Sequence, residues 1–335
     1  MKHLKFSDFS HYRRELMGIA IIGVCLLHAF AWTDIEGTKI ARIISPFARI
    51  AFTEGFLFLS GFGLYYSFCK NNNKRTFYLK RFNRVLLPYV IMCLPFFLRG
   101  LIGGVYDFPT VLLKFSTIYF WIFGNDGMWY ISLSVVLYLL FPFIFNFMFD
   151  IQKEKFVVQR ALTLIALCIA VCLMLYHFIP EYYKLIEIGV AKIPMFFIGM
   201  LTAYYAHNGK ELTIWHLFGG GILLCLTFLL KRYSEFWLSY YEMSYRLLMM
   251  PLSCIALKFL GNKRLNATLQ WFGSYSLEIY IMQILLFGTI GGLLKMTNLS
   301  ADWQPMIKVL LIFVIVLMLC APIHKVIGKL IKIIE

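Results

Sequence analysis

The sequence has few charged residues for its length. Only 15% of its 335 residues are Asp, Glu, Lys or Arg, whereas 61% are hydrophobic and the mean hydropathy is +0.75. A soluble domain of this size needs a polar outer face, so the composition excludes one. Apolar runs of the roughly 20 residues that cross a bilayer follow one another along the chain instead. The sequence therefore predicts an all-α, polytopic integral membrane protein.

Metal-binding patterns are also missing. The eight cysteines lie in or at the ends of apolar segments, and no set of Cys and His has the spacing of a zinc site. We interpret them as small core residues and expect no bound metal or cofactor.

Long polar linkers, low-complexity tracts and repeated halves are absent as well. We therefore expect one transmembrane domain over residues 1–335, without an appended soluble domain. The first apolar run is of full membrane-spanning length and has no clear small-residue cleavage site, so we expect a retained span rather than a signal peptide.

Hydropathy predicts about ten transmembrane segments. The apolar stretch 110–123 is short for a crossing and is typical of an interfacial or re-entrant helix, although a crossing there would invert everything after it. The predicted segments are residues 16–33, 43–68, 82–103, 128–149, 161–179, 186–206, 213–230, 241–260, 271–294 and 306–331.

The distribution of basic residues predicts the orientation. With the N-terminus inside, twenty Lys and Arg side chains fall in or near inner loops and eight in or near outer loops. This bias follows the positive-inside rule and predicts a multi-pass protein of the cell membrane with both termini in the cytoplasm. Topology thus explains much of the net charge of +15 without a nucleic-acid partner, and the basic inner face suits anionic lipids or an anionic substrate.

Two ionisable residues lie at similar depths in the first two predicted spans. His28 is about 18 Å from the inner face and Glu54 about 13 Å, at about 1.5 Å of rise per residue. A buried histidine is a candidate general base, and a neighbouring carboxylate would orient it. The alternatives are a histidine that only packs and a protonated Glu54 that acts as a structural donor.

Arg81 and Arg84 lie three residues apart at the cytoplasmic edge of the third span. This spacing places them on one helix face, where two guanidinium groups can hold phosphates through paired hydrogen bonds. The alternative is ordinary positive-inside anchoring.

Aromatic and acidic residues mark two further spans. Trp129 and Tyr130, at the outer end of the fourth span, suit either an aromatic belt or acceptor binding. Glu278 is another carboxyl group within the membrane, and we predict either a functional acid or a protonated structural donor.

Several other polar or small residues within spans have simpler interpretations. Glu242 and Arg246, four residues apart, are predicted to form an ion pair, and Lys192 is predicted to snorkel. Gly61 and Gly63 either allow close helix contact or loosen the helix to open a cavity.

Five segments resemble, in order, motifs of the membrane acyltransferase type 3 family, and together they cover most of the chain. They are Met17-Gly18-Ile19-Ala20 through His28, Glu54 through Ser60-Gly61-Phe62, Arg81 and Arg84 before Leu87-Pro88-Tyr89, Trp129-Tyr130 with Tyr138 and Pro142, and Ser276 through Gln283.

The resemblance implies transfer of an acyl group, commonly acetyl, from cytoplasmic acyl-CoA to a hydroxyl of a cell-envelope glycan. Acetyl-CoA would be a co-substrate, and the partners would be the glycan or glycolipid acceptor and membrane lipids. Arg81 and Arg84, with Arg14, would bind the acyl-CoA phosphates. His28 would deprotonate the acceptor or carry the acyl group, and Glu54 would orient it. The expected acceptor-binding or supporting residues are Trp129, Tyr130, Ser276, Glu278 and Tyr280.

The sequence departs from the family pattern at two positions, and two other functions stay open. Met17 replaces the arginine of the first helix, with Arg14 as a possible substitute, and Gln283 replaces the late histidine. A transporter or flippase would use His28, Glu54 and Glu278 as a proton or substrate path. A sensor or scaffold would retain the fold without catalysis.

Overall fold

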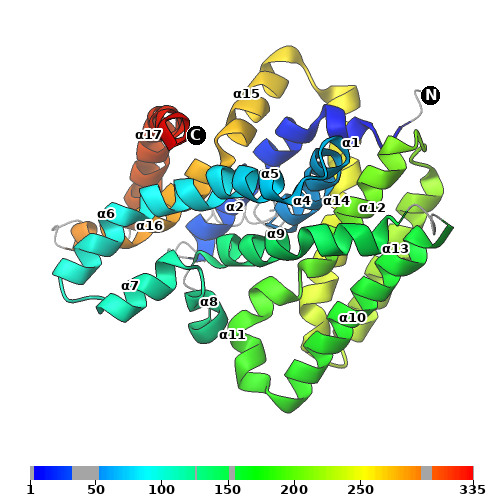
Figure 1. Cartoon of the computed structure of the whole chain (residues 1–335), viewed down its shortest axis with the longest axis horizontal. Helices are drawn as coiled ribbons and strands as arrows, with labels where there is room; N and C mark the ends of the chain where they lie inside the picture. Colours follow the sequence, from blue (N-terminus) through cyan, green and yellow to red (C-terminus); the bar gives the residue numbers. More distant parts are fainter. Residues whose placement is uncertain (1–3, 32–52, 125–126, 151–154, 296–303, 335) are drawn as a thin grey trace.

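The computed structural model describes residues 4–31, 53–124, 127–150, 155–295 and 304–334, and these form helices without a β-strand. Helices α10, α11 and α13 lie on one side and α16 and α17 on the other, with α2, α4 and α9 between them (Figure 1). The helices are α1 (Asp8–His11), α2 (Arg13–Ala31), α4 (Thr53–Lys70), α5 (Lys74–Arg81), the π-helix η1 (Phe82–Leu86), α6 (Leu87–Ile102), α7 (Phe108–Phe115), α8 (Tyr119–Phe123), α9 (Trp129–Met148), α10 (Val157–Phe178), α11 (Pro180–Val190), α12 (Ile193–His207), α13 (Ile214–Leu230), α14 (Phe236–Leu260), α15 (Lys263–Ser274), α16 (Ser276–Lys295) and α17 (Gln304–Ile334).

Six helical stretches within the described residues are long and apolar enough to cross a membrane. The predicted helical membrane class is therefore confirmed. The count of ten spans and the cytoplasmic termini stay predictions, and the predicted segment 43–68 lies partly outside the described residues. The six stretches are Lys74–Ile102, Trp129–Met148, Val157–Phe178, Pro180–His207, Phe236–Leu260 and Ile307–Ile333.

The apolar stretch 110–123 forms two short helices rather than one crossing. α7 and α8 are separated at Thr117, whose φ of 63° lies in the left-handed region and ends the helical path. Asp107 begins α7 by accepting a hydrogen bond from the Thr110 backbone N–H at 3.0 Å. The helical geometry therefore favours the interfacial or re-entrant prediction for this stretch.

The predicted span 271–294 is also interrupted. α15 ends at Ser274 and α16 begins at Ser276, so only the second part continues the expected path. α15 packs closely along α2, where a Cβ atom on Gly18 would lie 2.0 Å from the Leu269 carbonyl oxygen. A Cβ atom on Gly273 would lie 1.9 Å from the Arg14 carbonyl oxygen. Glycine at these two positions thus lets the α2 and α15 backbones meet.

Close helix contact also explains one of the glycines of α4. A Cβ atom on Gly61 would lie 2.1 Å from the Phe196 carbonyl oxygen on α12, and one on Gly199 would lie 2.0 Å from the Phe58 carbonyl oxygen. Gly63 serves a different purpose, because a Cβ atom there would lie 2.4 Å from Nη2 of Arg13. Gly61 therefore permits helix packing, and Gly63 leaves room for a guanidinium group.

Candidate active site

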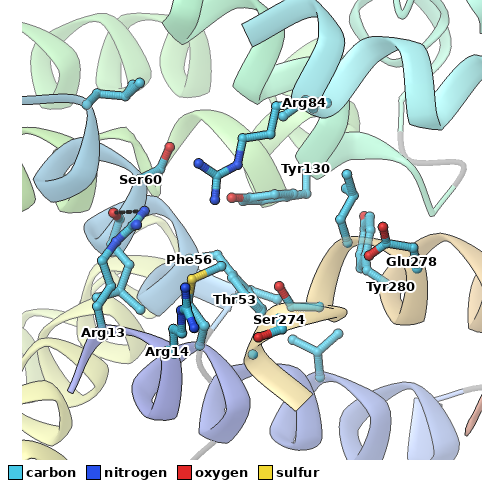
Figure 2. Close-up of a pocket in the computed structure, with 18 of the residues that line it drawn as sticks. Arg13, Arg14, Thr53, Phe56, Ser60, Arg84, Tyr130, Ser274, Glu278 and Tyr280 are labelled. Carbon is cyan, nitrogen blue, oxygen red and sulfur yellow. Dashed lines mark hydrogen bonds between the residues drawn. The ribbon is translucent and has the colours of Figure 1, made fainter. Parts of the chain in front are cut away.

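A cavity of about 610 Å³ opens between α2, α4, the α5–η1 junction, α9, α15, α16 and α17. Figure 2 shows Arg13 and Arg14 on one side of it and Glu278 and Tyr280 on the opposite side. Its polar lining residues are Arg13, Arg14, Thr53, Ser60, Arg81, Arg84, Tyr130, Tyr138, Ser274, Ser276, Glu278, Tyr280 and His324.

Four arginines from two parts of the chain line the cavity. Arg13 and Arg14 come from the start of α2, and Arg81 and Arg84 from the α5–η1 junction. Nη2 of Arg13 donates to the Leu59 carbonyl oxygen at 3.3 Å. Like charges gathered on one wall repel one another unless an anion lies between them, so the arrangement suits a ligand with several negative charges.

A π-helical turn begins directly after Arg81 and contains Arg84. η1 spans Phe82–Leu86 and joins α5 to α6 shortly before Pro88, which has no N–H to bond the preceding turn. Arg81 precedes this turn and Arg84 lies within it, yet both line the cavity. The sequence prediction that these two side chains share a face is confirmed.

His28 lies on the face of α2 that lines the cavity. Arg14, Met17 and Val24 line it, and His28 follows Val24 by one helical turn, so the four positions form one stripe, here called the α2 stripe. His28 is 9% exposed, and its ring centroid is 6.3 Å from that of Tyr280, a lining residue. The side chain of Gln283, which is 2% exposed, is a hydrogen-bond partner of His28.

Glu54 lies behind the cavity wall in a buried cluster of charges. Its carboxylate is 0% exposed and binds the Arg246 guanidinium, while Nζ of Lys192 lies 3.4 Å from the same Oε1 atom. Thr53, which lines the cavity, donates to Oε2 at 2.9 Å. Arg246 also binds Glu242 at 3.2 Å, which confirms that predicted pair.

This cluster changes two predictions. Lys192 does not snorkel: its ammonium group is directed to Glu54 and lies 4.9 Å from the ring centroid of Trp129. α11 and α12 break next to Lys192, which lets its side chain point inward. The polar partners of Glu54 in the described part of the chain are cations and Thr53 rather than His28, so its charge is balanced without the imidazole. Trp129 likewise belongs to this cluster rather than to the cavity wall.

A carboxylate–imidazole pair lies opposite the arginines. Nδ1 of His324, on α17, is 2.5 Å from Oε1 of Glu278, on α16, and both residues line the cavity. The Glu278 side chain is 5% exposed and that of His324 is 55% exposed. We had not singled out His324 from the sequence, because no spacing links residues 46 positions apart.

Seven of the ten predicted site residues therefore line one cavity. Of the other three, His28 lies one helical turn after the lining residue Val24, and Glu54 and Trp129 lie behind the cavity wall. The seven are Arg14, Arg81, Arg84, Tyr130, Ser276, Glu278 and Tyr280.

A comparison with known protein families identifies the chain. The family model Acyl_transf_3, described as an acyltransferase domain, matches residues 16–325. The chain belongs to this acyltransferase family. Neither the curated proteins nor the solved structures include a significant match to the chain.

The structure shows what stands at the two positions where this acyltransferase departs from the family pattern. Met17 lines the cavity, and Arg13 and Arg14 line it one turn earlier on α2, so cationic side chains are still present there. Gln283 contacts His28, so an amide occupies the position of the missing late histidine.

The described segments hold no group of three or more His, Cys, Asp and Glu side chains that could bind a metal ion. All eight cysteines are free thiols.

Proposed function

We propose that this acyltransferase moves an acyl group, most simply acetyl, from acyl-CoA to a hydroxyl of a cell-envelope glycan or glycolipid. The α2 stripe is the observation that carries the proposal. It begins with Arg14 among four arginines and ends at His28, a distance of about 21 Å at 1.5 Å per residue. A donor with phosphates at one end and a thioester at the other suits a site in which the arginines and His28 lie this far apart.

The arginines would bind the donor phosphates. Guanidinium groups form paired hydrogen bonds with phosphate oxygens, and the donor's charge would relieve the repulsion among Arg13, Arg14, Arg81 and Arg84. Because the positive-inside bias predicts this end of α2 to face the cytoplasm, a cytoplasmic acyl-CoA would enter there.

His28 would act at the thioester end. A neutral imidazole can remove the proton of an acceptor hydroxyl, which then attacks the thioester carbonyl, or can itself attack and carry the acyl group. In either route the carbon–sulfur bond breaks and the acyl group ends on the acceptor oxygen. Gln283 holds the ring in place by its contact with His28.

The hydroxyl-bearing residues that line the cavity would bind the acceptor. Tyr130, Ser276 and Tyr280 line the cavity, and the Tyr280 hydroxyl donates to the Gly127 carbonyl oxygen at 2.6 Å. The rings of Tyr130 and Tyr280 are 5.8 Å apart between centroids and form a joint aromatic wall. Such a wall has polar edges for sugar hydroxyls and apolar faces for sugar rings or a lipid.

The test is thiol release from acetyl-CoA by the purified protein in detergent, with and without an envelope-glycan extract. Extract-dependent release of coenzyme A, with label from the acetyl group recovered on the glycan, is the expected result. No release with any extract, together with solute movement by the protein in liposomes, would support a transporter instead.

A further inference from the structure

The Glu278–His324 pair has the geometry of an oriented acid–base group. A carboxylate only accepts hydrogen bonds, so Nδ1–H of His324 donates to Glu278 across 2.5 Å. This leaves Nε2 as the ring position that exchanges a proton with a third group. A buried carboxylate that fixes one ring nitrogen while the other stays accessible is the arrangement by which enzymes orient a histidine base.

Helix α16 connects the pair to the surroundings of His28. Glu278 precedes Gln283, the hydrogen-bond partner of His28, by five residues on α16, which is about 7.5 Å along the helix axis. Tyr280, next to His28, lines the same cavity as Glu278 and His324. The pair therefore lines the cavity that the proposed donor would occupy.

The proposed reaction requires two proton transfers that this pair can carry out. When His28 takes the acyl group, the carbon–sulfur bond breaks and leaves a thiolate, which needs a proton. When an acceptor hydroxyl then attacks the acyl group on His28, that hydroxyl loses a proton.

We propose that His324, oriented by Glu278, is the acid and base for these two steps. In the first half-reaction His324 starts as the imidazolium, with a proton on each ring nitrogen. The nitrogen of His28 bonds to the acyl carbon, the electron pair of the carbon–sulfur bond goes to sulfur, and Nε2–H of His324 protonates the thiolate. In the second, Nε2 of His324 removes the hydroxyl proton as oxygen bonds to the acyl carbon, and the electron pair of the carbon–nitrogen bond returns to His28. Both histidines end in their starting forms, so no further reactant is needed. This inference rests on the proposed function.

Other titratable or charged groups lie around the pair or line the same cavity. The Tyr275 ring lies 5.3 Å from that of His324, and the Cys320 thiol on α17 donates to the Leu317 carbonyl oxygen at 3.5 Å. Four arginines line the wall across the cavity: Arg13, Arg14, Arg81 and Arg84.

The experiment measures the first half-reaction separately from the second. Exchange of labelled coenzyme A into acetyl-CoA, without acceptor, measures the first half-reaction from pH 5 to 9 in wild type, His324→Gln, Glu278→Gln and the exposed control Lys325→Gln. A general acid typically contributes about 10²–10⁴-fold, so His324→Gln is expected to slow exchange about 100-fold or more. It is also expected to remove the decline in rate as pH rises, and added imidazole should restore part of the activity of His324→Ala. Glu278→Gln should cause a smaller loss, and Lys325→Gln none.

The outcomes separate this inference from the proposed function. Absence of thiol release in wild type, with or without acceptor, contradicts the proposed function itself. Thiol release that requires acceptor, with no exchange, overturns the two-step role of His324. A His324→Gln enzyme whose exchange keeps the wild-type pH profile also overturns it. So does an exchange rate lowered equally at every pH, when imidazole does not rescue His324→Ala; this result shows a structural role.

Discussion

The carboxylate of Glu54 on α4 binds the guanidinium group of Arg246 on α14, although 192 residues separate them in sequence. Both side chains are buried, at 0% and 9% exposure, and Lys192 completes the charge balance around Glu54. Because Thr53 lies between this cluster and the cavity, the ion pair fixes one wall of the site.

Removing the negative charge from this cluster is expected to destabilise the protein strongly. Glu54→Gln leaves Arg246 and Lys192 without their buried counter-charge, and breaking a buried pair typically costs about 3–5 kcal/mol. We expect a lower thermal unfolding temperature and reduced yield in detergent. Glu242→Gln is the matched control, since the Glu242 side chain is 47% exposed and such pairs contribute about 0–1 kcal/mol. Equal unfolding temperatures for the two variants would contradict this role of Glu54.

Two glycines on α4 are expected to respond differently to the same substitution. Gly61→Ala places a methyl group against the backbone of α12, and overpacking of this kind costs about 1–3 kcal/mol or more. Gly63→Ala meets only the end of the Arg13 side chain, which can move. We therefore expect Gly61→Ala to lower the unfolding temperature, and Gly63→Ala to keep it while raising the KM for acetyl-CoA. The reverse ranking of unfolding temperatures would contradict the packing account.

The arginines are expected to recognise donor phosphates rather than the acyl group. Arg84→Ala should raise the KM for acetyl-CoA by about tenfold or more, since charge-assisted hydrogen bonds contribute about 1.5–3 kcal/mol. It should leave the kinetics with acetyl-pantetheine, a thioester without phosphates, unchanged. Arg75→Ala, at an exposed position of α5 outside the cavity lining, is the control. An equal loss with both donors would show that Arg84 does not bind phosphate.

Composition and local spacing predicted the class and much of the site. The apolar runs identified a helical membrane protein, because a lipid-facing surface requires apolar side chains over each span. The three-residue spacing of Arg81 and Arg84 predicted a shared face, and both line the cavity. The position of His28 within an apolar helix marked it as a candidate functional residue, and it lies on the stripe of α2 that begins among the arginines.

The remaining features depend on which helices pack against one another, and a hydropathy profile does not predict this. Thr53 and Lys192 are 139 positions apart in sequence, and Lys192 reaches Thr53 and Glu54 because α4 packs on α12. Glu278 meets His324 because α16 packs on α17. The break at Tyr275 was not predicted, because a hydropathy average over a whole span does not resolve the short polar stretch Ser274-Tyr275-Ser276.

The most direct test of the account is the transfer of labelled acetyl from acetyl-CoA to an envelope-glycan extract by wild type and by His28→Ala. The two proteins are compared at matched expression and matched unfolding temperature. We predict that wild type labels the glycan and that His28→Ala does not, because His28 is the group that takes the hydroxyl proton or the acyl group itself. Equal labelling by the two proteins would remove His28 from the chemistry and contradict the account.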